Sequence, residues 1–74
     1  MEDVRIRLEK EGWNFSVQRH KGTYGADVGL FEIGIWQTEG HTEIKVMGWQ
    51  GLKECFEKFK EFCENPEKFY WRAN

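Results

Sequence analysis

The sequence predicts a two-layer α+β domain in which two helices pack on one face of a three-stranded antiparallel meander, in the order α-β-β-β-α. Two observations predict this class. Apolar and polar residues alternate in the middle of the chain, as in half-buried strands, and apolar residues recur at helical spacing from Leu52 onward. The length of 74 residues allows a single domain, residues 1–74. A chain of this size buries only ~60% of the surface that its unfolded form exposes, so every large apolar side chain matters.

The first element is predicted to be a short helix that begins after Asp3 and ends at Gly12. Asp3 is a suitable N-cap, and Gly12 suits the left-handed conformation that often follows a helix. The alternation of apolar and charged side chains over residues 4–8 also fits a strand. The ending Leu8–Gly12 favours the helix.

Three strands are predicted to follow: Trp13–Gln18, Val28–Trp36 and His41–Trp49. Residues 21–27 contain two glycines and form the first connection. The second connection, Gln37–Gly40, predicts a register in which Glu32 lies opposite Lys45. That opposite-charge pair supports the register.

The same register assigns a face of the sheet to each side chain. The inner face, which meets the helices, is predicted to carry Phe31, Ile33, Ile44 and Val46. The outer face is predicted to pair Leu30 with Met47, Val28 with Trp49, and Trp36 with His41.

The C-terminal region is predicted to contain the strongest helix of the chain, followed by a short aromatic turn. Its apolar residues form a stripe ~120° wide: Leu52, Cys55, Phe56, Phe59, Phe62 and Cys63. Asn65 followed by Pro66 ends this helix and resembles an N-cap with proline in the first turn. The short turn then carries Phe69, Tyr70 and Trp71.

The charge and cysteine content exclude several classes of function. Eleven basic and 13 acidic residues give a formal charge of −2, which disfavours binding to nucleic acid. The chain has no run of ~18 apolar residues and no signal-peptide pattern, so we expect a cytoplasmic protein with reduced thiols and no membrane contact. Cys55 and Cys63 are about 12 Å apart on one helix and are expected to be core residues.

No pattern typical of catalysis, metal binding or cofactor binding is present. His20 and His41 are predicted to lie at opposite ends of the sheet, with no nucleophile beside them. The segment Gly22–Gly25 lacks the lysine and hydroxyl residues of a phosphate-binding loop. We therefore expect no enzyme activity, no metal and no small-molecule cofactor.

The outer sheet face is the predicted partner-binding surface, because both faces of the second and third strands carry large apolar residues. The contact residues are predicted to be Leu30, Trp36, Met47 and Trp49, with Gly34 leaving backbone open beside Trp36. Four covers are considered for this face: the segment Phe69–Trp71, a second copy of the chain, a different protein, or a small ligand. Glu57 and Glu61, on the polar side of the long helix, form a predicted second surface.

The order α-β-β-β-α is also that of double-stranded-RNA-binding domains and of HicA toxins. The segment Leu8–Trp13, followed by Arg19–Thr23, resembles the HicA pattern of a helix ending in Gly-Trp and then Arg-x-Lys-Gly-Ser-His. The resemblance covers about a quarter of the chain and implies RNA binding or cleavage. Tyr24 stands where that family has its catalytic histidine, and the last helix begins Leu52-Lys53-Glu54 without the lysines that grip RNA phosphates.

The leading hypothesis is a small intracellular protein-interaction domain, of the kind that phages and other mobile elements encode. It would contact an unknown protein or itself through the outer sheet face. The alternatives are an RNA-binding or RNA-cleaving protein related to the HicA shape, and a structural homodimer.

Overall fold

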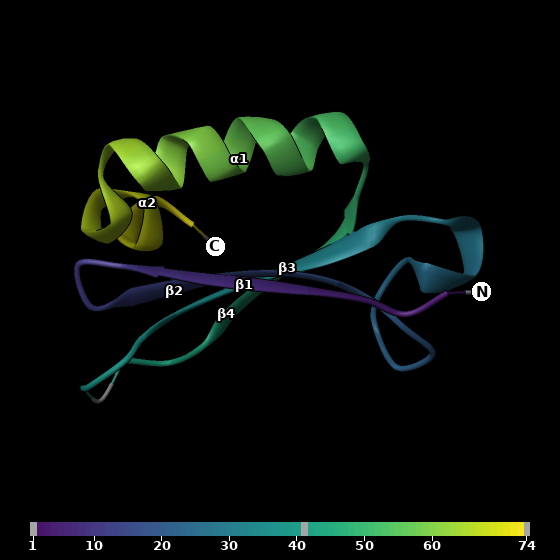
Figure 1. Ribbon diagram of the computed structural model, residues 1–74, viewed down its shortest axis with the longest axis horizontal. Coiled ribbons are helices and arrows are strands. Elements are labelled where there is room, and N and C mark those ends of the chain that lie inside the picture. Colours follow the sequence, from purple (N-terminus) through teal and green to yellow (C-terminus); the bar gives the residue numbers. More distant parts are fainter. Residues whose placement is uncertain (1, 41, 74) are drawn as a thin grey trace.

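The computed structural model describes residues 2–40 and 42–73 and contains a four-stranded antiparallel sheet with two helices on one face (Figure 1). The elements are β1 (Val4–Lys10), β2 (Trp13–Arg19), the 3-10 turn η1 (Ala26–Val28), β3 (Phe31–Gln37), β4 (Lys45–Gln50), α1 (Leu52–Glu64) and α2 (Pro66–Arg72). Each strand pairs with its neighbour in sequence, giving the sheet order β1-β2-β3-β4. The α+β class is confirmed, but the prediction of three strands is wrong.

The segment predicted as the first helix is strand β1. Glu11 and Gly12 have φ values of 53° and 82°, so they form a two-residue turn in the left-handed conformation that β-hairpins prefer. This turn places Leu8 opposite Phe15 and Ile6 opposite Val17. Gly12 does adopt a left-handed conformation, but in a hairpin turn rather than after a helix.

The predicted strand Trp13–Gln18 is confirmed as β2, whereas β3 begins later than predicted. Gly25 and Gly29, with φ values of 91° and 77°, flank η1, so the chain is still turning at Val28. A Cβ atom at Gly25 would lie 3.1 Å from Trp49 Cα, which shows how closely this turn packs on β4. β3 consequently begins at Phe31 rather than at Val28.

The predicted register between β3 and β4 is wrong. Gly34 lies opposite Val46 and Ile33 opposite Met47, which is three residues away from the register that pairs Glu32 with Lys45. The cause lies at the end of β3, where Thr38 N–H donates to Gly12 C=O at 2.8 Å. Because of this bond, the chain after β3 continues beside the first hairpin as far as Thr38 before it turns back toward β4.

An odd shift in register turns a strand over, because successive side chains point to opposite faces. Met47 therefore packs against the core, whereas Val46 is 42% exposed and Ile44 is 63% exposed. The prediction that Ile44 and Val46 face the helices is wrong, as is the prediction that Met47 lies on the outer face. The predicted first residue of this strand, His41, and its pairing with Trp36 lie outside the described residues.

The long C-terminal helix forms as predicted, and the predicted short aromatic turn is the seven-residue helix α2. Asn65 Oδ1 accepts the N–H of Lys68 at 3.1 Å and so caps α2, in which Pro66 occupies the first turn. Lys45 Nζ, on the inner face of β4, donates to the carbonyls of Tyr70 and Ala73, each at 2.9 Å. A cation at the C-terminal end of a helix is favourable, so this contact fastens α2 to the sheet.

The core lies between the sheet and the helices and is largely aromatic. The ring of Phe15 lies 5.2 Å from that of Phe62 and 6.0 Å from that of Phe69, and the ring of Trp13 lies 4.8 Å from that of Tyr70. Phe69 and Tyr70 of the aromatic C-terminal segment thus pack on the inner face, whereas Trp71 is exposed. The segment does not cover the outer face.

The observed register predicts that Met47, and not the adjacent Val46, contributes to the stability of the fold. Met47→Ala should lower the free energy of unfolding by about 2 kcal/mol, since it removes a side chain that packs on the core. Val46→Ala should cost less than about 1 kcal/mol because that side chain is exposed. Urea unfolding measures both values. A larger loss for Val46→Ala would contradict this register.

Candidate interaction surfaces

The outer face of the sheet does not collect the predicted contact residues. Met47 lies on the other face, among the core residues. Trp36 is half-buried, and its ring lies 3.5 Å from the point where a Cβ atom of Gly34 would be. Ser16 Oγ lies 2.8 Å from the same point. The space above Gly34 is therefore filled by the chain itself and is not open to another group.

Leu30 and Trp49 lie beside Gly25, in the turn that contains η1, and not on the exposed outer face of the sheet. Both surround Gly25, whose Cβ position is 3.0 Å from Leu30 Cβ and 3.1 Å from Trp49 Cα. Leu30 is half-buried there, whereas Trp49 is exposed and has a φ of 60°. The two residues are neighbours, but they form no patch with Trp36 or Met47.

A network of hydrogen-bonded polar side chains lies on the outer face between β1 and the end of β3. Arg7 Nη1 donates to Asn14 Oδ1 at 3.2 Å, and Asn14 Nδ2 donates to Thr38 Oγ1 at 2.7 Å. Thr38 Oγ1 in turn donates to Glu9 Oε2. Asn14 is only 1% exposed, so these bonds satisfy a buried amide and hold the hairpin in place.

The predicted acidic surface lies on the solvent side of α1. Glu57 Oε1 is 4.0 Å from Lys53 Nζ, in an exposed pair that carries little energy. Glu61 borders a wide hollow of about 700 Å³ between α1, α2 and β4, whose lining includes Lys58, Lys68 and Arg72. Charges of both signs meet there, so no strongly acidic field develops.

An apolar groove lies between β1 and α1. Its floor consists of Ile6, Leu8, Phe15 and Val17, and its wall consists of Leu52, Cys55, Phe56 and Phe59. We call it the inner groove. It has a volume of about 230 Å³ and is lined entirely by apolar side chains. Ile6 is 58% exposed and Phe56 is 65% exposed, so the groove is open to solvent.

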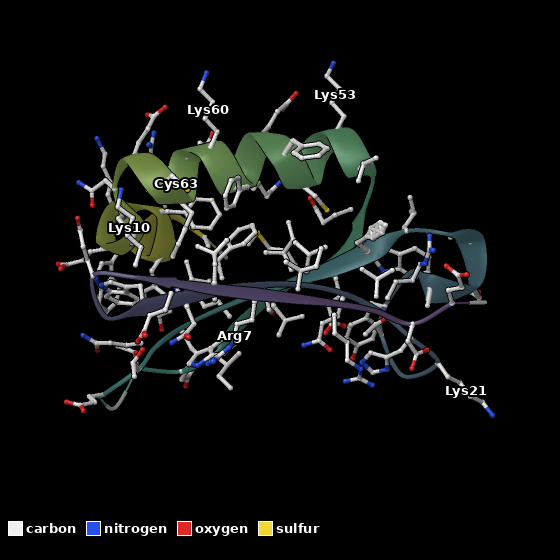
Figure 2. All side chains as sticks on the ribbon, in the orientation of Figure 1. Arg7, Lys10, Lys21, Lys53, Lys60 and Cys63 are labelled. Carbon is white, nitrogen blue, oxygen red and sulfur yellow. The ribbon has the colours of Figure 1, made fainter. Side chains whose placement is uncertain are left out.

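Beyond one end of the inner groove, a hydrogen bond links β1 to α1. Lys10 Nζ donates to the carbonyl of Cys63 in the last turn of α1. Figure 2 shows Lys10 reaching toward this end of the helix, whereas Arg7 extends from the other face of the sheet. The open part of the groove therefore lies toward the N-terminal half of α1, beside Leu52 and Phe56.

The inner groove was not predicted from the sequence, although its wall belongs to the predicted apolar stripe of α1. Only part of that stripe meets the sheet: Cys55 and Phe62 are buried, whereas Leu52 and Phe56 are exposed. The width of the apolar stripe was the sequence signal for this groove, because the sheet covers only part of the stripe. The sequence predicts a helix over the residues of β1, so the floor of the groove does not follow from it.

The segment that resembles the HicA motif forms a compact turn. The ring of His20 bonds Gln18 Oε1 through Nε2 at 2.9 Å, and its Nδ1 accepts the N–H of Gly22 at 3.3 Å. Thr23 Oγ1 accepts the N–H of His20 at 3.0 Å and donates to its carbonyl at 2.9 Å. Both ring nitrogens of His20 thus have partners within or beside the turn.

The described residues contain no cluster of three or more histidine, cysteine, aspartate or glutamate side chains able to hold a metal ion. Among residues 2–40 and 42–73, no helix is both long and apolar enough to cross a membrane. Both cysteines are free, Cys55 buried and Cys63 half-buried, as expected for core residues. Burial raises the pKa of the Cys55 thiol, and Lys58 offsets only part of that effect.

Comparisons with protein-family models, with curated proteins and with solved structures gave no match. The functional argument therefore depends on the geometry of this chain.

Because its pKa is raised, Cys55 should react slowly with alkylating reagents. Thiolate is the nucleophile, and a raised pKa lowers its fraction at any pH below that value. With Cys63→Ser, alkylation by iodoacetamide at about pH 8 should be at least about tenfold slower in the folded protein than in urea. Equal rates would contradict the burial of this thiol. Cys55→Ser gives the matched measurement on Cys63.

Proposed function

We propose that the protein is a small interaction domain that binds another polypeptide through the inner groove. The observation that carries this proposal is the exposure of four large apolar side chains around one groove: Ile6, Leu52, Phe56 and Phe59. Soluble monomers seldom leave a contiguous apolar patch of this kind without a partner. The cost is high in a chain so small, because these side chains could otherwise enlarge its core.

The shape and chemistry of the inner groove favour a polypeptide over a small ligand. Pockets for small molecules usually place a few polar groups among apolar ones, and those groups orient the ligand. The lining of the inner groove is apolar throughout. The groove also runs along β1, a strand at the edge of the sheet. A bound chain could therefore use backbone hydrogen bonds as well as apolar contacts.

The surface predicted from the sequence offers less to a partner. Met47 belongs to the core, and Trp36 covers Gly34, which leaves Trp49 as the exposed member of the predicted contact set. Glu57 and Glu61 remain on the solvent side of α1 and would form a charged rim rather than an apolar contact. We therefore place the interaction on the inner face of the sheet.

Selection of peptides from a display library on the immobilised protein tests this function. Immobilisation at low density keeps copies of the chain apart. We expect selected peptides to carry alternating apolar residues, and their affinity to fall at least about tenfold with Phe56→Ser, since aromatic contacts at an interface carry much of the affinity. Trp71→Ser is the matched control, because Trp71 is 62% exposed but lies outside the inner groove.

Two results would contradict the proposed function. The first is that no peptide is selected by the folded protein. The second is that selected peptides bind the Phe56→Ser and Trp71→Ser variants equally well, which would place their contact elsewhere. Circular dichroism of each variant establishes that it remains folded.

A further inference from the structure

Strand β1 has an unpaired edge among the described residues, because it lies at the end of the sheet and pairs only with β2. The two-residue turn at Glu11 and Gly12 is closed by hydrogen bonding between Lys10 and Trp13, the residues that flank it. Hydrogen-bonded and non-hydrogen-bonded pairs then alternate along the hairpin. The N–H and C=O groups of Arg5, Arg7 and Glu9 consequently point away from β2, to the free edge.

The side chains of β1 divide cleanly between the two faces of the sheet. Ile6 and Leu8 lie on the inner face, opposite Val17 and Phe15, and form part of the floor of the inner groove. The three residues whose backbone groups point to the free edge have charged side chains on the outer face: Arg5, Arg7 and Glu9. A partner strand at this edge must match an apolar inner row and a charged outer row.

We propose that the partner is β1 of a second copy of the chain, paired antiparallel across a two-fold axis at Arg7. In this arrangement Arg5 of each copy lies opposite Glu9 of the other, so two opposite-charge pairs form on the outer face. Ile6 lies opposite Leu8 twice on the inner face. Opposed residues of an antiparallel pair share a face and contact one another, so both rows of β1 are self-complementary. This inference rests on the proposed function, since it names a second copy of the chain as the polypeptide that meets the inner groove.

Neighbouring registers fit less well. A two-fold axis at Ile6 would set Arg5 opposite Arg7 on both sides, and like charges directly opposite are destabilising. An axis at Leu8 would form two opposite-charge pairs of Arg7 with Glu9, but it would set Ile6 opposite Lys10. It would also place Val4 and Arg5 beside the turn, outside the partner's β1. Only the axis at Arg7 pairs all seven residues of β1, with Ile6 opposite Leu8 and Val4 opposite Lys10.

In the proposed pairing of two β1 strands, like charges lie opposite each other only at the two-fold axis, where the two Arg7 side chains meet. The guanidinium of Arg7 donates to Asn14 Oδ1 at 3.2 Å, which directs it across β2 and away from the free edge. Asn14 is buried and bonds Thr38 as well, so it holds this position firmly. The network on the outer face thus lowers the repulsion at the axis.

Pairing of two β1 strands would join the two inner grooves. The floors become continuous through Ile6 and Leu8 of both copies, and each α1 stands on its own side of the joint with Phe56 facing the shared floor. The apolar residues left exposed in one copy then meet those of the other. The joint is isologous, so it closes at two copies and leaves no further β1 edge.

Sedimentation equilibrium of the purified protein between about 10 μM and 1 mM tests the pairing. We expect a monomer–dimer equilibrium. Arg5→Glu should weaken it at least tenfold, because the two-fold axis turns two attractive contacts into two repulsive ones. Arg5→Glu combined with Glu9→Arg should restore the dimerisation constant to within about threefold. Lys21→Glu, with the same change of charge on an exposed loop, is the matched control and should leave it unchanged.

A second variant blocks the backbone of the edge rather than its charge. Arg5→Pro removes an N–H that points away from β2, so the hairpin should persist while the dimer is lost. Thermal unfolding of every variant shows whether the fold is retained.

Several results would overturn the pairing: a monomer throughout the concentration range, a dimer that Arg5→Glu and Arg5→Pro leave intact, or a double charge exchange that fails to restore a folded protein's dimer. Peptide binding that depends on Phe56 in a chain that stays monomeric would overturn this pairing and leave the proposed function standing. If the folded chain neither dimerises nor binds peptides, the proposed function is contradicted as well.

Discussion

The two-residue turn at Glu11 and Gly12 is the constraint on which most of this structure depends. It folds β1 onto β2, and its Gly12 carbonyl accepts the N–H of Thr38. β3 therefore follows β2 to Gln37 before the chain leaves the sheet, and β4 begins at Lys45. The burial of Met47 and the exposure of Val46 follow from that starting point. A left-handed turn near the N-terminus thus determines which side chains of the last strand reach the core.

The parts of the fold that could be predicted from the sequence are those with local causes. The apolar stripe of α1 and the Asn65-Pro66 start of α2 depend on residues within a few positions of each other. α1 forms as predicted, and α2 begins where predicted but is a helix rather than a short turn. The first strand could not be distinguished from a helix, because its alternating pattern gains meaning only when Leu8 meets Phe15 on another strand. The register of β4 likewise depends on Thr38 and Gly12, which are 26 positions apart.

The sequence predicts that some large apolar side chains stay exposed, but it does not predict where on the surface they lie. Large apolar side chains are indeed exposed, but Ile6 and Phe56 gather on the inner face instead of the outer one. The odd shift in register places Met47 in the core, and the sheet leaves Leu52 and Phe56 of the α1 stripe uncovered. Composition reveals that a chain has more apolar surface than it can bury, whereas only the strand order reveals where the remainder lies.

The consecutive order of the strands has a consequence for synthesis. Every pairing in the sheet joins strands that are consecutive in the sequence. During translation the whole sheet emerges before α1 and α2, the segments that bury Phe15 and Ile33. The nascent chain therefore passes through an interval in which an aromatic sheet face has no cover. That face stays uncovered until the residues of α1 and α2 have left the ribosome and packed on it.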